Sequence, residues 1–176
     1  MDKDVTDFAG KALLRDLREQ VETAAGIAQA AHALADAGLV ARAVELANDA
    51  DVPIHSAGSL LGLATTVVRS VDNDTAPAGS DALDRPPAPS AAAKTQVDPT
   101  LADKTARAFL ALARDKLHAA VGVAKAAELC AATGNLRACV RAALDLEPML
   151  FDARRLIDAA SLVTREASAE PDEPLT

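Results

Sequence analysis

The strongest constraint on the fold is an internal repeat, in which residues 4–69 align with residues 100–165 without a gap. Shifting the chain by 96 positions gives 19 identities over the 66 aligned positions. Chance would give about 7 in a chain so rich in alanine, so the excess indicates tandem duplication. The identities include turn and helix-interior glycines as well as alanines, which indicates that both copies share one architecture.

The composition of the repeated unit favours helices. Half of the chain is apolar, mainly alanine with leucine and valine, whereas Trp and Tyr are absent. Alanine and leucine are strong helix formers, and β-branched and aromatic residues dominate strands. We therefore expect an all-α protein, built by tandem duplication of a three-helix unit that packs as a helical bundle.

Periodicity divides each unit into a long helix, a short helix and a third helix. The long helices are predicted near 5–37 and 101–133, and the short ones near 39–49 and 136–146. The third helices are predicted to follow Pro53 and Pro148, since proline suits a helix start.

Cap and turn residues recur in both copies. Asp4 and Thr100 are the predicted N-caps of the long helices. Gly38 and Gly134 are the predicted stops of the same helices, because glycine readily takes the left-handed conformation that ends a helix.

The remaining chain separates these units. The predicted first helical unit is 1–70, the second is 100–166, and 71–99 is a linker rich in Pro, Ala and Asp. Such a composition buries too little apolar surface to order itself. Residues 167–176 are predicted to form an acidic flexible tail.

Each long helix carries an apolar seam with alternate spacings of three and four residues, as in a helix that packs along another. The two seams become almost all alanine toward their C-terminal ends, so a partner helix can approach closely. The seam positions are Leu14, Leu17, Val21, Ala24, Ala28, Ala31 and Ala35, and Leu110, Ala113, Leu117, Ala120, Ala124, Ala127 and Ala131.

Gly26 and Gly122 lie away from the seam, in the middle of the long helices. A mid-helix glycine costs about 1 kcal/mol relative to alanine. We expect a second close contact there, with the two long helices crossing near a pseudo-two-fold axis; the alternative is that both copies inherited a tolerated glycine. The helix-interface candidates are Gly26, Ala30, Gly122, Ala126, Ala28, Ala31, Ala124 and Ala127.

The charge is distributed unevenly over a chain with net charge −8. Residues 1–69 hold 10 acidic and 6 basic residues, a net −4, and residues 100–165 hold 7 and 10, a net +3. An acidic net charge argues against nucleic acid as a partner. Four basic residues are candidate contacts for an acidic partner, although docking on the acidic first unit or solvation is favoured: Arg137, Arg141, Arg154 and Arg155.

Two cysteines, Cys130 and Cys139, lie on either side of the turn at Gly134 and could face each other across a helical hairpin. Their counterparts in the first unit are Leu34 and Ala43, so apolar packing is favoured over a redox role.

The histidines, His32, His55 and His118, occupy non-equivalent places in the two units. The chain lacks the Glu-x-x-His pairs of a di-iron bundle, and we expect no metal and no cofactor.

Residues 142–153 resemble the junction between tetratricopeptide repeats, with Ala143 and Pro148 at pattern positions. That family repeats about every 34 residues. Because the spacing here is 96, the resemblance implies a local helical hairpin and carries over no binding site.

The charged N-terminal sequence and the absence of a long apolar run predict a cytoplasmic protein without a membrane span. Phosphate-loop, nucleophile-elbow and Cys-x-x-Cys motifs are missing, so we expect no enzyme.

The leading functional hypothesis is a non-enzymatic helical interaction or assembly module that acts through alanine-rich helix faces. Its expected partner is another protein or a second copy of the same chain, in a homodimer. The alternative is a small-molecule or cofactor carrier with a pocket between the two repeats.

Overall fold

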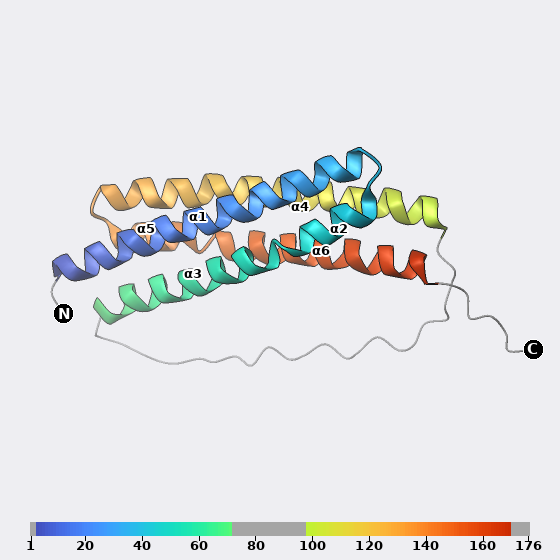
Figure 1. Cartoon of the computed structure of the whole chain (residues 1–176). Coiled ribbons are helices and arrows are strands. Elements are labelled where there is room, and N and C mark those ends of the chain that lie inside the picture. The colour runs from blue at the N-terminus through green and yellow to red at the C-terminus, as the bar shows by residue number, and fades with distance from the viewer. Residues whose placement is uncertain (1–2, 72–97, 170–176) are drawn as a thin grey trace, which may run out of the picture.

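The computed structural model describes residues 3–71 and 98–169, with side chains described for 7–68 and 98–169. Every regular element in these two ranges is a helix, which confirms the all-α prediction. The elements, shown in Figure 1, are α1 (Lys3–Asp36), α2 (Val40–Asn48), α3 (Asp51–Val71), α4 (Pro99–Ala132), α5 (Leu136–Ala143) and α6 (Leu146–Ser168).

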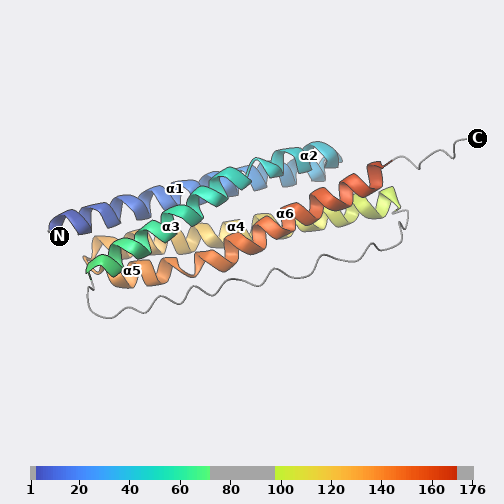
Figure 2. The same cartoon turned by 90° about the horizontal axis from the view of Figure 1, so that it is seen from below.

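The four longer helices, α1, α3, α4 and α6, pack as a bundle. Helix α1 lies between α3 and α4, and α4 lies between α1 and α6. The long helices α1 and α4 run antiparallel side by side, and α3 and α6 run antiparallel below them (Figures 1 and 2). Each half of the chain therefore contributes one helical hairpin. Its first arm is a single long helix, α1 or α4, and its second arm consists of a short helix followed by the third helix of that half.

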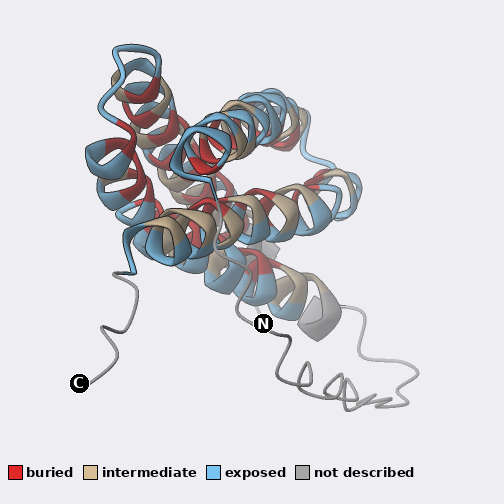
Figure 3. Ribbon diagram, turned by 90° about the vertical axis from the view of Figure 1, so that its right-hand side faces the viewer, coloured by how far each residue is buried: buried red, intermediate tan, exposed pale blue. Residues whose placement is uncertain are grey.

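The predicted apolar seams form the bundle core. All fourteen seam positions are buried, and none is more than 3% exposed. Figure 3 shows the buried residues turned inward on each helix. The third helices add a second set of buried residues, namely Ile54, Ala57, Leu61 and Ala64 on α3, and Leu150, Ala153, Ile157 and Ala160 on α6. Alanine at so many contact positions lets the helix axes approach closely.

The two long helices end at glycines, as predicted. Gly38 has φ +84° and Gly134 has φ +80°. The N–H of Leu39 donates to the carbonyl of Leu34 at 2.9 Å, so the left-handed glycine turns the chain and satisfies a carbonyl that the helix leaves free. An L-residue with a Cβ is strained at that φ.

The prediction that Thr100 caps the second long helix is wrong. Helix α4 begins at Pro99, and Asp98 is its N-cap, with Oδ1 accepting from the N–H of Thr100 at 2.9 Å. An aspartate followed by proline supplies both a side-chain acceptor and a preset helical φ, so the helix starts inside the predicted linker. The prediction that Asp4 caps the first long helix is wrong as well, because α1 begins at Lys3 and Asp4 lies inside it.

The third helices also start earlier than predicted. Pro53 and Pro148 are the third residues of α3 and α6, where a backbone N–H has no partner within the helix. Helix α6 extends to Ser168 and so takes in the first residues of the predicted tail.

The rest of the linker and of the tail lies outside the described residues. None of the helices described here combines the length and the apolar character needed to cross a membrane.

Candidate functional site

Basic and acidic side chains alternate in a row along the outer surface of the α1–α4 pair, here called the charged row. Arg18 of α1 lies between Glu22 on its own helix and Glu128 on α4, with Nη1–Oε2 at 3.2 Å and Nε–Oε2 at 2.7 Å. Lys125 Nζ of α4 is 3.2 Å from Glu22 Oε1. The Arg18 Nε–H is not aligned for a hydrogen bond to Glu128, so this contact is mainly Coulombic. Two of these pairs, Arg18–Glu128 and Lys125–Glu22, join α1 to α4.

Gly26 and Gly122 lie beside this charged row: Gly26 is one helical turn from Glu22, and Gly122 is one turn from Lys125. Each glycine is exposed together with an alanine one turn further along its helix, and we call these four residues the glycine face: Gly26 and Ala30 on α1, and Gly122 and Ala126 on α4. A Cβ built on either glycine meets no atom within 4 Å. The contact predicted at these glycines is therefore not made by the residues that the structure describes.

The reason lies in the helix geometry, because successive side chains are rotated by about 100° around the axis. The other four interface candidates lie on the seam and are buried in the bundle, namely Ala28, Ala31, Ala124 and Ala127. The long helices do pack against each other, but the glycine face is turned to solvent.

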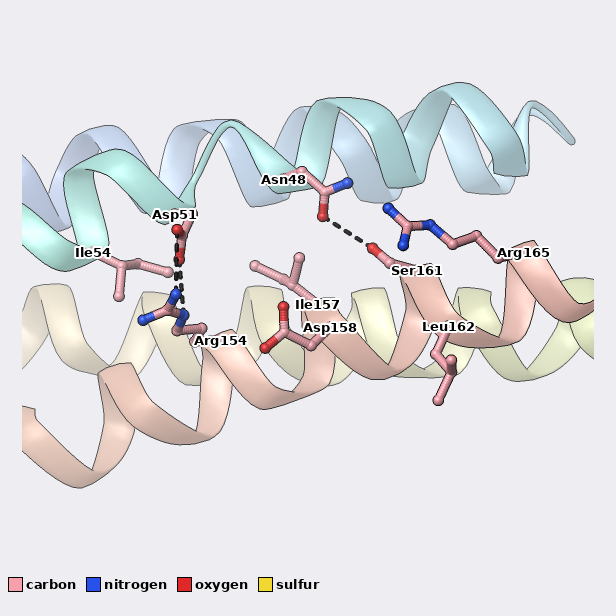
Figure 4. A pocket seen from close by; sticks show the side chains of 9 residues that line it. All are labelled: Asn48, Asp51, Ile54, Arg154, Ile157, Asp158, Ser161, Leu162 and Arg165. Atoms are coloured by element: carbon pink, nitrogen blue, oxygen red, sulfur yellow. Dashed lines mark hydrogen bonds and ion pairs between the residues drawn. The ribbon is translucent and has the colours of Figure 1, made fainter. Parts of the chain in front are cut away.

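A groove of about 520 Å³ separates the α2–α3 junction from α6 (Figure 4). Its lining mixes apolar and polar side chains from both halves of the chain, namely Asn48, Asp51, Ile54, Arg154, Ile157, Asp158, Ser161, Leu162 and Arg165. Two contacts cross it. Arg154 Nε lies 2.8 Å from Asp51 Oδ1, and Ser161 Oγ donates to Asn48 Oδ1 at 2.9 Å.

The four basic candidates do not form one anion site. Arg154 of α6 pairs with Asp51 of α3, which is the docking on the acidic half that the charge asymmetry favoured. The guanidinium of Arg155 lies 5.6 Å from the ring centroid of Phe151, a cation–π contact. Arg137 and Arg141 are exposed on α5.

The two cysteines face each other across the α4–α5 hairpin, as expected from their spacing. Cys139 Sγ lies 2.9 Å from Cys130 Sγ, and both thiols are free. Cys139 is fully buried, whereas Cys130 is partly exposed. Burial, with the hydrogen bond and the charge of Cys130 as further causes, raises the pKa of Cys139 to about 12. Cys139 is thus held as a neutral thiol.

The histidines are dispersed. His32 Nε2 lies 3.5 Å from Asp36 Oδ2 on the same helix, while His55 borders a hollow between α3 and α6 and His118 borders another between α1 and α4. Within residues 3–71 and 98–169, no three His, Cys, Asp or Glu side chains gather in a way that could hold a metal ion.

The groove and its Asp51–Arg154 pair were not predicted from the sequence. The opposite net charges of the two halves indicated that they dock, but not which residues meet.

The chain matches no protein-family model, no curated protein and no solved structure.

Proposed function

We propose that the chain is a non-enzymatic assembly module whose docking surface is the glycine face, and that the partner is a helix pair from a second copy. The observation that carries this is the exposure of Gly26 and Gly122 in the middle of two long helices. Each costs about 1 kcal/mol of helix stability relative to alanine, and no contact within residues 3–71 and 98–169 offsets that cost. A helix docked closely on the face would offset it.

The surroundings of the face suit a second copy. Glycine and alanine leave the backbone accessible, so a partner backbone can approach more closely than larger side chains allow. Acidic and basic side chains alternate along the same surface, with Glu22 and Glu128 beside Arg18 and Lys125. A surface that carries both signs in alternation can be self-complementary when two copies meet about a two-fold axis.

The test is the molar mass in solution, measured by light scattering over a range of concentrations. Wild type is expected to form a dimer, and the double variant Gly26→Leu, Gly122→Leu a monomer with unchanged helicity. Ala41→Leu is the control, because it places a leucine at an exposed helix position on α2, outside the glycine face. A wild type that stays monomeric throughout, or a double variant that dimerises like wild type, contradicts the proposal.

We also propose that the two halves arose by tandem duplication. Their helices have 34, 9 and 21 residues in the first half and 34, 8 and 23 in the second. Matching glycines end both long helices with similar positive φ. The proposal requires that Lys3–Val71 superpose on Pro99–Ser168 in an experimental structure, and a different helix arrangement in the two halves would contradict it.

The alternative function, a carrier with a pocket between the halves, is favoured by one observation, the groove beside α6. It presents Ile54, Ile157 and Leu162 next to two arginines and two aspartates, of which Arg154 and Asp51 already pair, so an amphipathic small molecule is the ligand class that it fits. Native mass spectrometry of the purified chain is the test. A co-purified mass that is lost in Leu162→Arg, at an exposed lining position, supports a carrier, and a chain that carries no added mass argues against one.

A further inference from the structure

We propose that Cys130 and Cys139 form a reversible dithiol–disulfide site, for which the oxidant is a low-molecular-weight disulfide. Their sulfur atoms are 2.9 Å apart. A disulfide bond is about 2.05 Å long, so closure requires an approach of about 0.9 Å. The two residues belong to different helices, joined by the turn at Gly134, and a small movement of α5 relative to α4 suffices.

Exposure assigns different roles to the two thiols. Cys130 lies in the last turn of α4 and is partly exposed, so a reagent in solution reaches it first. Cys139 is fully buried on α5. Its S–H can donate to Cys130 Sγ at 2.9 Å or to the carbonyl of Asn135 at 2.8 Å, but one proton serves only one of them at a time. At Cys130 the attacking form is the thiolate.

The reaction is ordinary thiol–disulfide exchange. The Cys130 thiolate attacks one sulfur of the small disulfide, whose S–S bond breaks, giving a mixed disulfide at Cys130 and a small thiolate that leaves. Cys139 then gives up its proton to solvent base, and its sulfur attacks Cys130 Sγ and expels the second small thiol. Two protein thiols are oxidised to one disulfide, and one small disulfide is reduced to two thiols.

The bond would tie α5 to the end of α4. Leu136, the first residue of α5, lies against Gly10 of α1, where a Cβ would overlap the leucine side chain. Oxidation therefore holds the hairpin in the position in which α5 covers the start of α1. In the first half, Leu34 and Ala43 occupy the corresponding places, so the site belongs to the second half alone.

The experiment treats the reduced full-length chain with oxidised glutathione and follows intact mass and peptide maps. Wild type is expected to end two hydrogens lighter, with one peptide link between Cys130 and Cys139, and to return to its starting mass with a dithiol reductant. In Cys139→Ala, position 139 carries alanine, as the equivalent position 43 of the first half does. The reaction of this variant should stop at the mixed disulfide on Cys130. Cys130→Ser should react at Cys139 only after denaturation.

Three results would overturn the proposal. These are wild type that takes up one or two glutathione adducts without forming the internal link, wild type that does not react, and fast reaction of native Cys130→Ser at position 139. The wild-type masses decide the question alone if either variant fails to fold. The result is independent of dimerisation through the glycine face, since it is read on the covalent structure of the monomer.

Discussion

The guanidinium of Arg154 on α6 lies 2.8 Å from the carboxylate of Asp51 on α3, and this ion pair crosses the groove between the acidic and the basic half of the chain. A second pair of atoms, Arg154 Nη2 and Asp51 Oδ2, lies 3.4 Å apart. The contact joins residues separated by 103 positions, so it reports directly on how the halves dock.

The first prediction concerns the energy of this pair. Both side chains are half exposed, so water screens their attraction, and we expect a coupling of about 0.2–1 kcal/mol. A double-mutant cycle with Asp51→Asn and Arg154→Gln, measured by urea unfolding, isolates this coupling from the effect of Asp51 on the first turn of α3. The coupling should shrink at high salt. A coupling of zero at low salt would show that the pair does not help to dock the halves.

The second prediction tests the alanine seam. Ala124 is 1% exposed, and leucine there should overpack the core and lower the free energy of unfolding by about 1–3 kcal/mol. Ala126, two residues further along the same helix, is exposed, and Ala126→Leu should change the stability of the monomer by less than about 0.5 kcal/mol. Equal effects at the two positions would mean that the seam has been assigned to the wrong face of α4.

The third prediction compares two glycines of the second half. Gly134 has φ +80°, so Gly134→Ala should cost about 1–2 kcal/mol of stability. Gly122 is helical with open space around its Cα, so Gly122→Ala should stabilise the monomer by up to about 1 kcal/mol. Thermal melts at a concentration where the chain is monomeric measure both. Opposite signs are required, and a loss of stability in Gly122→Ala would reveal a contact there.

The fourth prediction concerns alkaline pH. Burial raises the pKa of Cys139 from 9.0 to about 12, so the folded chain keeps the proton that the unfolded chain loses. The resulting stability is fully present below pH 9.0 and is lost as the pH rises toward about 12. The free energy of unfolding, measured under reducing conditions, should therefore fall more steeply over this range in wild type than in Cys139→Ala. Parallel curves would place Cys139 in contact with water.

Much of the fold is predictable because it depends on residues close together in the sequence. The spacing of Leu14, Leu17 and Val21 specifies which face of α1 is buried, and no knowledge of the partner helix is needed. Gly38 and Gly134 mark helix ends because the left-handed conformation is a local backbone property. The nine-residue separation of Cys130 and Cys139 around such a turn likewise predicts that their sulfurs meet.

The errors at the helix starts are also local. Thr100 and Asp98 are both capping residue types, and the choice between them depends on Pro99, whose ring presets the first helical φ. The residues before Asp98 have the composition of a linker, so Asp98 and Pro99 were assigned to the linker and not to the helix start.

The six helices of the described residues, their glycine turns and their buried faces follow from the sequence, apart from the exact helix starts, because periodicity and turn chemistry act within a few residues. The sequence does not show which residues form the surfaces between and outside the helices. It could not determine that Gly26 and Gly122 face solvent or that Asp51 meets Arg154, because those outcomes depend on the relative rotation and crossing of helices that are distant in sequence. That arrangement results from the packing of the four longer helices against one another, so no single segment of the sequence specifies it.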